Sequence, residues 1–234
     1  ADLIDAAPAV ALAVYAHPDD PEVACGGTLA RWAAAGAEVH LLIVCAGDKG
    51  STDPGATPAD VAARRAIEVG AAATRLGLAS HVLLGLPDGG VEDDASLREA
   101  LVSAIRRVRP DAVVGPDPTA AFFGRTYINH RDHRVVGWAM LDAVAPAAWS
   151  PLYFPAAGPP HRVAEVYLSG TLHPDVYVDI GATLDAKAAA LRCHESQLGG
   201  SDEVVATAVR QRAADAGRAA GVGYAEGFRL LTPS

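Results

Sequence analysis

Two short polar motifs in this sequence combine the residue types that bind metal ions and move protons. The first, HPDD at residues 17–20, places His17 and Asp20 three residues apart across a turn. The second, HRDH at residues 130–133, has two histidines at the same spacing with an acid between them. Imidazole nitrogens and carboxylate oxygens both bind zinc well, and three protein ligands plus a water are typical of a catalytic zinc site.

Each motif taken alone also has an ordinary structural interpretation. An aspartate before a proline is common at the start of a helix, so His17 could be a loop histidine that binds no metal. The second motif could likewise be a polar loop with an acid that caps a helix. The metal hypothesis therefore depends on whether the fold brings the two motifs together.

Predicted strands precede both motifs. Continuous apolar runs, which are typical of strands buried on both faces, occupy residues 10–16, 39–46, 81–86 and 111–115. Helices are predicted over residues 21–35, 59–76, 95–109 and 131–145. This alternation predicts an α/β fold with a Rossmann-like, mostly parallel sheet and helices on both faces. Ligands bind at the carboxyl edge of such a sheet, and four loops should share it: residues 17–20, 47–58, 87–94 and 116–130.

The rest of the chain is predicted to add irregular structure to the same domain. A proline-rich segment at residues 146–160 is followed by two predicted strands, at residues 163–169 and 176–180. A predicted helix at residues 183–197 and a polar, alanine-rich tail complete the chain. No linker is long enough to divide the chain, so residues 1–234 are expected to form a single domain.

Composition argues against several kinds of partner. The net charge is −9 and there is no basic run, so no nucleic-acid partner is expected. The apolar run at residues 10–16 is too short to span a membrane, and no basic stretch precedes it as in a signal peptide. The three cysteines are far apart with no CxxC spacing, which indicates reduced thiols and a cytoplasmic protein. A homo-oligomer is compatible with this composition.

Together the motifs resemble those of the PIG-L/LmbE-like family of zinc-dependent N-deacetylases. AHPDDPE at residues 16–22 matches the first family motif, and HRDH matches its H-x-D-H motif. Further matches follow in the family order: GGTL at residues 26–29, an R-x-x-E helix ending in LG at residues 65–77, and K-x-x-A-L-x-x-H-x-S-Q at residues 187–197. The resemblance implies the LmbE-like fold and hydrolysis of an N-acetyl or related N-acyl group on an amino sugar.

The resemblance also implies a cofactor and its ligands. His17, Asp20 and His133 would hold a zinc ion, although Fe²⁺ or another divalent metal could use the same ligands. Zinc lowers the pKa of a bound water to about 7, which makes water a usable nucleophile for a stable amide. The expected substrate is a small amino sugar, in an N-acetylglucosamine-containing conjugate.

Further residues receive roles only through the resemblance. Asp19 would be the general base, and His130 would polarise the amide carbonyl or protonate the leaving amine. Asp132 would orient His130 and favour its charged form. Arg65 and Asp88 match positions that contact substrate hydroxyls in similar proteins.

One position departs from the family pattern. Some relatives carry a tyrosine two residues before the second motif, where it assists the developing oxyanion, but this chain has Ile128 there. Tyr127, one residue further back, is a candidate substrate contact in its place. Structural roles are favoured for Lys187 and for the pair His194 and Gln197, which lie one turn apart.

Two other functions remain open. A thiol-conjugate amidase could use the same metal site on a larger amide, given an open pocket around residues 120–129 and 146–160. A sugar-binding module that has lost catalysis is the other alternative, and the complete set of metal ligands and acids argues against it. Measurement of bound zinc and of acetate release from N-acetyl sugars would distinguish these functions.

Overall fold

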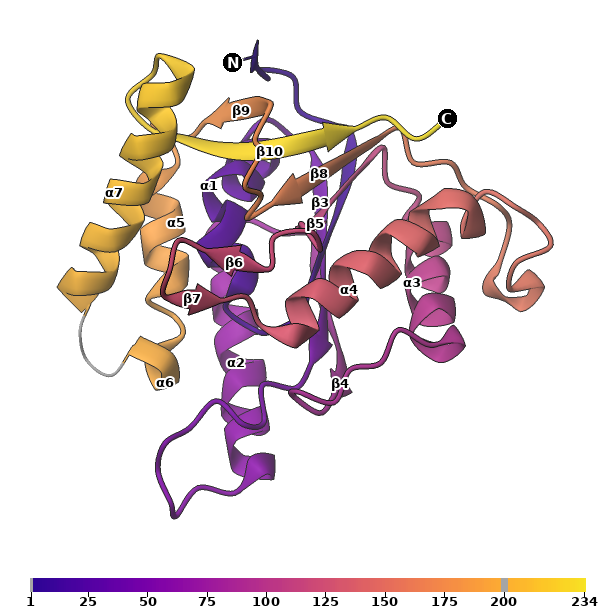
Figure 1. The fold of residues 1–234 in the computed structure, drawn as a ribbon, viewed down its shortest axis with the longest axis horizontal. Helices are drawn as coiled ribbons and strands as arrows, with labels where there is room; N and C mark the ends of the chain where they lie inside the picture. The colour runs from indigo at the N-terminus through magenta and orange to yellow at the C-terminus, as the bar shows by residue number, and fades with distance from the viewer. Residues whose placement is uncertain (1, 199–201) are drawn as a thin grey trace.

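An eight-stranded sheet runs through the centre of the molecule (Figure 1). The computed structural model describes residues 2–198 and 202–234. The strands of this sheet are β1 (Asp2–Leu3), β2 (Val10–Tyr15), β3 (Glu38–Cys45), β4 (Ser80–Leu86), β5 (Ala112–Pro116), β8 (Glu165–Ser169), β9 (Val176–Asp179) and β10 (Ala225–Leu231). They lie in the order β1-β9-β10-β8-β5-β2-β3-β4. All neighbouring strands pair in parallel except β10, which is antiparallel to both β8 and β9.

Helices cover both faces of the sheet. They are α1 (Asp20–Ala34), α2 (Pro58–Leu76), α3 (Ala95–Val108), α4 (Arg131–Asp142), α5 (Leu184–Leu191), α6 (Glu195–Leu198) and α7 (Asp202–Ala220). One face carries α1, α2, α5 and α7, and the other carries α3 and α4 (Figure 1). The expected α/β fold, with a mostly parallel sheet and helices on both faces, is confirmed.

Strand β2 shows why both faces are covered. Alternate side chains of a strand point to opposite faces of the sheet. Ala11, Ala13 and Tyr15 belong to the core beneath α1 and α2, whereas Leu12 and Val14 belong to the core beneath α3 and α4. Because all five side chains are buried, the strand is an uninterrupted apolar run in the sequence.

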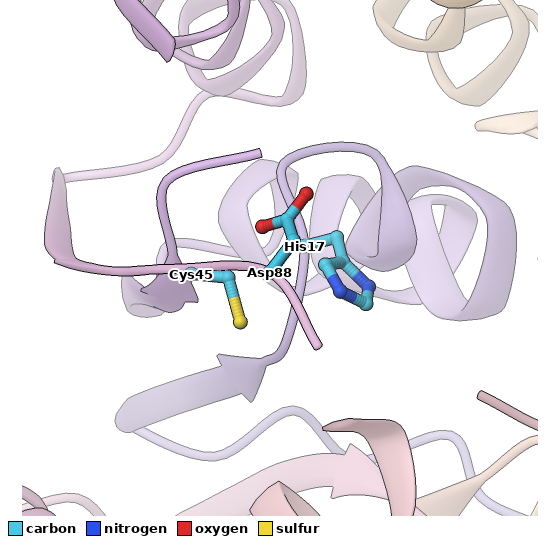
Figure 2. Close-up of side chains that lie close together, drawn as sticks. All are labelled: His17, Cys45 and Asp88. Carbon is cyan, nitrogen blue, oxygen red and sulfur yellow. The ribbon is translucent and has the colours of Figure 1, made fainter. Parts of the chain in front are cut away.

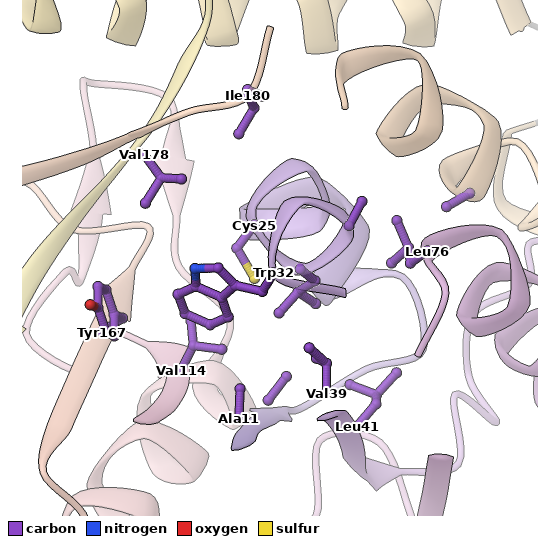
Figure 3. Close-up of a cluster of buried hydrophobic side chains, with 14 of the residues drawn as sticks. Ala11, Cys25, Trp32, Val39, Leu41, Leu76, Val114, Tyr167, Val178 and Ile180 are labelled. Carbon is purple, nitrogen blue, oxygen red and sulfur yellow. The ribbon is translucent and has the colours of Figure 1, made fainter. Parts of the chain in front are cut away.

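Aromatic side chains pack among aliphatic ones in the first of these two cores (Figure 3). Trp32 of α1 meets Tyr167 of β8 edge to face with ring centroids 5.3 Å apart, and Tyr167 meets Phe228 of β10 at 5.7 Å. Cys25 of α1 lies in the same core as a free thiol (Figure 3). This packing fixes α1, and with it the loop at residues 17–20, against the sheet.

The C-terminal part of the chain is more ordered than the sequence predicts. The segment expected to be a polar tail instead forms α7 and β10, and β10 lies inside the sheet between β8 and β9. The prediction was wrong because the buried face of α7 consists of small residues such as Ala213 and Gly217, which give little amphipathic contrast.

Two other elements also differ from expectation. The helix predicted over residues 183–197 is interrupted between α5 and α6, and the interruption turns His194 inward, where it is fully buried. The helix predicted over residues 131–145 ends at Asp142 and continues as a π-helical turn that contains Pro146, because proline cannot donate a helical hydrogen bond. The loop after β5 also contains an unpredicted hairpin, β6 (Phe122–Phe123) and β7 (Tyr127–Ile128).

The loops expected at the carboxyl edge of the sheet do meet there. Asp88, in the loop after β4, accepts a 2.9 Å hydrogen bond from the backbone amide of Gly47, in the loop after β3. The backbone amide of Gly89 donates to Asp132, at the start of α4. Asp132 in turn contacts His17, in the loop after β2. Four loops that are distant in the sequence therefore enclose one site.

Candidate metal centre and active site

Three side chains converge on one point at the carboxyl edge. His17 lies in the turn after β2, Asp20 begins α1, and His133 lies in the first turn of α4. His17 Nδ1 and His133 Nε2 are 3.1 Å apart although 116 residues separate them in the chain. Asp20 Oδ1 lies 3.1 Å from His133 Nε2, and Asp20 Oδ2 lies 3.5 Å from His17 Nδ1. The structure therefore brings together the two halves of the predicted metal site.

These separations fit a metal ion. Zinc bonds of about 2.0–2.2 Å to nitrogen and oxygen, in a tetrahedral arrangement, place neighbouring ligand atoms about 3.4 Å apart. The three observed separations, 3.1, 3.1 and 3.5 Å, lie close to that spacing. Three ligands of this kind leave a fourth position for a water or substrate, as catalytic sites require.

Both histidine rings are held by their second nitrogen. His17 Nε2 lies 3.2 Å from Asp132 Oδ2, and His133 Nδ1 lies 2.9 Å from Asn129 Oδ1. Asn129 is itself fixed, because its Nδ2 donates a 2.7 Å hydrogen bond to the carbonyl of Ala120. Histidine ligands of metals commonly bond a carboxylate or carbonyl through the nitrogen that does not bind the metal. Each ring is thereby oriented with its other nitrogen facing the common point.

The charges in this cluster favour a cation. Burial alone lowers the pKa of His17, but hydrogen bonds to Asp20 and Cys45 outweigh burial and raise the pKa to about 11. Burial also opposes ionisation of Asp20, yet hydrogen bonds to His133 and His17 hold its pKa well below its usual range. The carboxylate thus holds positive charge at this point, as a proton on His17 or as a metal ion in its place.

His17 also lies near Cys45 and Asp88 (Figure 2). Burial raises the pKa of the Cys45 thiol, which disfavours the thiolate that a metal would need. The two carboxylate oxygens of Asp88 already accept backbone hydrogen bonds, from Gly47 at 2.9 Å and Lys49 at 3.3 Å. His17, Cys45 and Asp88 are therefore a poorer metal site than His17, Asp20 and His133. Asp88, which was predicted to contact substrate, instead accepts hydrogen bonds from the loop after β3.

Asp19 lies beside the metal ligands in the wall of a cavity. Its Oδ1 accepts a 2.8 Å hydrogen bond from Arg65 Nη2. The Asp19 side chain is 30% exposed, whereas that of Arg65 is only 4% exposed. Asp19 is therefore held at one oxygen and remains accessible from the cavity. Arg65, also predicted to contact substrate, is placed by the structure against Asp19.

His130 is the N-terminal cap of α4 and is half exposed. Its Nδ1 accepts a 3.2 Å hydrogen bond from the backbone amide of Asp132, so in the neutral ring the proton lies on Nε2. Burial and the charge of His17 lower the pKa of His130, and Asp132, whose Oδ2 lies 3.6 Å from Nδ1, acts in the opposite direction. The Asp132 carboxylate is closer to His17, at 3.2 Å from Nε2, so it contacts His17 directly, whereas the Asp132 backbone amide donates to His130.

A cavity of about 730 Å³ opens beside the metal ligands. Asp19, Asp20 and His133 are in its wall, and so is Tyr127 of the β6–β7 hairpin. Ile128, the neighbour of Tyr127, is 72% exposed and is not among the described residues of this wall. The wall also includes three charged residues from the C-terminal part of the chain, which are Lys187, Arg212 and Glu226.

Sequence reasoning missed two features of this site. Asn129 was not singled out, although its position four residues before His133, one helical turn, was a signal that it could reach that ring. The pairing of Arg65 with Asp19 was also missed, because it depends on how α2 lies against α1.

Comparison with known proteins agrees with this geometry. Residues 12–144 match the family described as PIG-L, GlcNAc-PI de-N-acetylase. The chain belongs to this family. Diacetylchitobiose deacetylase of Thermococcus kodakarensis is 31% identical over 94% of this chain and 82% of its own length. A 1D-myo-inositol 2-acetamido-2-deoxy-alpha-D-glucopyranoside deacetylase of Streptomyces avermitilis is 32% identical over 70% of this chain and 62% of its own.

Solved structures of PIG-L relatives share the fold. N,N'-diacetylchitobiose deacetylase from Pyrococcus horikoshii has a TM-score of 0.88 at 28% identity, covering 96% of this chain and 84% of that chain. GalB, the 4-carboxy-2-hydroxymuconate hydratase from Pseudomonas putida KT2440, has a TM-score of 0.80 at 26% identity, covering 96% and 97%. The chain is a hydrolytic enzyme of the deacetylase kind, on a fold that also serves a hydratase.

Proposed function

We propose that this protein removes the N-acetyl group from an N-acetylglucosamine-containing conjugate, with a divalent metal ion, zinc in the first place, at His17, Asp20 and His133. The observation that carries the proposal is the convergence of three ligand atoms, 3.1–3.5 Å apart, beside an accessible carboxylate. The relatives named as deacetylases of acetylated amino sugars support the substrate class. The products are acetate and a free amine.

The side chains around the ligands divide the work of hydrolysis. A divalent cation held there supplies Lewis acidity, which makes water a nucleophile near neutral pH. Asp19 lies in the cavity wall next to the ligands and takes the proton from the attacking water. Arg65 holds one oxygen of Asp19, so the orientation of the base is set before substrate binds.

His130 supplies a proton donor beside His17. The rings of these two histidines are 4.7 Å apart and perpendicular. In its neutral form His130 Nε2–H donates a hydrogen bond to the amide oxygen, where negative charge develops. Burial and His17 lower the pKa of His130, which makes the charged ring a stronger acid, and Asp132 partly offsets them. In this charged form His130 passes a proton to the departing amine.

The cavity is large enough for more than an acetyl group. Its volume of about 730 Å³ is typical of sites that hold a whole small molecule. The sugar and part of what is attached to it therefore fit inside. A larger amide would also fit, so a thiol-conjugate amidase with the same metal site is the second candidate.

Two further expectations belong to the same proposal. We treat residues 1–234 as a single domain, because β10 pairs with β8 and β9 within the one central sheet. The free thiols of Cys25, Cys45 and Cys193 favour a reducing compartment such as the cytoplasm. Among the described residues, no helix is both long and apolar enough to cross a membrane.

The test is a substrate panel with purified, zinc-loaded protein. N-acetylglucosamine, diacetylchitobiose, an N-acetylglucosaminyl inositol and a thiol-conjugate amide are incubated separately, and acetate and free amine are measured by mass spectrometry. We expect acetate from at least one N-acetyl sugar, loss of activity on chelation, and recovery with zinc. Cleavage of the thiol conjugate alone would identify the amidase. Bound metal without cleavage of any amide would refute the proposal and favour a sugar-binding module or a hydratase.

A further inference from the structure

The side chain of Arg65, which comes from α2, packs closely against a backbone loop. We call residues 47–50, which follow β3, the glycine loop. A Cβ atom on Gly47 would lie 2.7 Å from Arg65 Cδ, and a Cβ on Gly50 would lie 2.6 Å from Arg65 Nη1. Gly47 also has a φ of +75°, which side-chain-bearing residues rarely adopt. The loop can therefore pass this close to the Arg65 side chain only because both positions are glycine.

Helix α6 holds the glycine loop and α2 together. Gln197 Nε2 donates a 2.8 Å hydrogen bond to the carbonyl of Gly50 and a 2.9 Å bond to Ser196 Oγ. The backbone amide and hydroxyl of Ser196 donate to the two carboxylate oxygens of Glu68, at 2.8 and 2.7 Å. Glu68 is one turn beyond Arg65 on α2, so these bonds fix both sides of the arginine.

The start of α6 is tied to α1 as well. His194 Nε2 lies 3.2 Å from Glu22 Oε2, and both side chains are at most 1% exposed. Glu22 is in the first turn of α1, which begins at the metal ligand Asp20. Residues 194–197 thus connect α1, α2 and the glycine loop, the three elements that set the distance between Arg65 and Asp19.

We propose that Ser196 and Gln197 are positioning residues for the general base, which they fix through Arg65. The inference rests on the proposed function, because it takes Asp19 as the base. Neither Ser196 nor Gln197 is among the described residues that line the cavity, so their effect on the reaction passes through Arg65. Both lie outside residues 12–144, which match the family model, and belong to the late motif at residues 187–197.

The test compares Gln197→Ala with Gln211→Ala. Gln211 is an exposed residue of α7 whose Nε2 donates a 2.8 Å hydrogen bond to Asp215. Gln211→Ala therefore removes the same side chain and a similar hydrogen bond, but one that does not contact the glycine loop. We expect Gln197→Ala to lower kcat at least ~10-fold, because a misplaced catalytic group can cost about 100-fold. The KM for the best N-acetyl sugar and the zinc content should stay within about twofold of wild type. Gln211→Ala should leave all three quantities unchanged.

A serine pair and a double variant exclude a merely structural effect. Ser196→Ala should lower kcat, and Ser196→Thr, which keeps the hydroxyl for Glu68, should restore most of it. In an Asp19→Ala background, Gln197→Ala should cause no further loss of the residual turnover, because the two residues act as one unit. Should Gln197→Ala fail to fold, the serine pair decides by the same criteria.

Three results would overturn the inference. They are an unchanged kcat in both Gln197→Ala and Ser196→Ala, a rise in the KM of these variants without a fall in kcat, or loss of zinc from them. A failure of the proposed function is distinguishable, because then the wild type itself cleaves no amide. In that event crystal structures of wild type and Gln197→Ala still test whether Gln197 holds Arg65 in position. The 2.8 Å contact between Arg65 Nη2 and Asp19 Oδ1 should lengthen or break in the variant, and an unchanged contact contradicts the inference.

Discussion

Each of the two imidazoles in the proposed metal site has a contact at both of its nitrogens, but their outer partners differ. His17 faces a carboxylate, Asp132, whereas His133 faces an amide, Asn129. A carboxylate makes an imidazole more basic than an amide does, so His17 is the stronger donor to a cation. Asn129 acts mainly by fixing the angle of the His133 ring.

This difference predicts the effect of changing Asn129. Asn129→Ala should weaken zinc binding by about 10- to 100-fold, because the His133 ring loses its orienting acceptor. Asn129→Asp, which keeps an oxygen at that position, should retain most of the affinity. Zinc titration against a competing chelator measures both, with exposed His173→Ala as the control. An affinity for Asn129→Ala within twofold of wild type would refute the orienting role.

Asp19 should be separable from the metal ligands by experiment. Asp19→Ala should keep its zinc and lose about 10²- to 10⁴-fold in kcat, because general-base help has that size. Asp185→Ala removes an exposed carboxylate paired with Arg210 and should have no effect on either quantity. Zinc content and acetate release are measured on the same preparations. Substantial activity in Asp19→Ala would mean that another group takes the proton.

The sequence reveals these residues to different degrees. The two motifs predict that their donor side chains meet at one edge of the sheet, and the structure brings them together there. The choice of His17, Asp20 and His133 as the ligands comes from the family resemblance and stays a prediction. The contacts of Arg65 and Asp88 could not be predicted, since a buried side chain satisfies whichever partner the packed helices and loops bring to it. Resemblance assigned both to substrate, whereas in the structure each contacts the protein itself.

At the scale of elements, the β6–β7 hairpin forms an aromatic part of the cavity wall. Tyr127 and Phe123 face each other with ring centroids 5.9 Å apart, and both line the cavity. Their neighbour Phe122 is 62% exposed and is not among the described lining residues. Alternation along a strand explains this difference, because successive side chains point to opposite faces.

The hairpin therefore offers a matched pair of variants. Tyr127→Ala should raise KM for the sugar by roughly 2- to 10-fold, the size of a lost aromatic contact of about 0.5–1.5 kcal/mol, with unchanged zinc content. Phe122→Ala removes a similar ring from the other face and should leave KM unchanged. Steady-state kinetics with Tyr127→Phe then shows whether the hydroxyl contributes. Equal effects of Tyr127→Ala and Phe122→Ala would argue against a specific contact.

Helix α1 depends on a residue from the last strand of the sheet. A kink at Cys25, where φ is −148°, interrupts the helix, and the carboxylate of Glu226 accepts the backbone amides of Gly27 and Thr28 at 3.0 and 2.7 Å. Lys187 of α5 pairs with the same carboxylate at 2.5 Å, and both side chains are at most 5% exposed. One buried ion pair thus joins α1, α5 and β10.

Loss of that lysine should cost more stability than loss of a surface partner. Lys187→Ala leaves Glu226 buried without its cation, which should lower the free energy of unfolding by about 3–5 kcal/mol. Arg210→Ala breaks an exposed pair with Asp185 and should cost about 0–1 kcal/mol. Urea unfolding of the two variants makes the comparison. Similar losses of unfolding free energy in the two variants would mean that the buried ion pair does not stabilise the contact between α1, α5 and β10.

The sequence predicts the first half of these elements better than the second. Strands β2, β3, β4 and β5 are short apolar runs, each separated from the next by a helix, so their presence and parallel direction can be predicted. Their order in the sheet cannot, because β5 lies beside β2 and not beside β4. Strand β10 pairs antiparallel with β8 and β9, and no local pattern in its sequence specifies that insertion. The short hairpin strands β6 and β7, two residues each, are likewise too brief to have a period.

Over the whole molecule, metal binding and folding should be coupled. The proposed ligands come from the turn after β2, from α1 and from α4, and α4 is adjacent to the other two only in the folded chain. A cation that needs all three therefore stabilises the native state. Zinc at 100 times its Kd should add about 2.7 kcal/mol to the free energy of unfolding. Thermal unfolding with and without zinc measures this, and His133→Ala should lose most of the effect. A melting temperature that does not respond to zinc would contradict the site.

The cavity wall is formed by two parts of the chain that can diverge independently during evolution. The groups proposed to break the amide bond precede residue 145, whereas Lys187, Arg212 and Glu226 in the same wall come after it. Mutations in the later part can therefore change which conjugates fit and leave the inherited hydrolytic step intact. Two features limit diversification of this kind. The buried pair of Lys187 and Glu226 must keep α1, α5 and β10 together, and α6 must remain compatible with the glycine loop. Relatives with new specificities should therefore vary around these residues rather than within them.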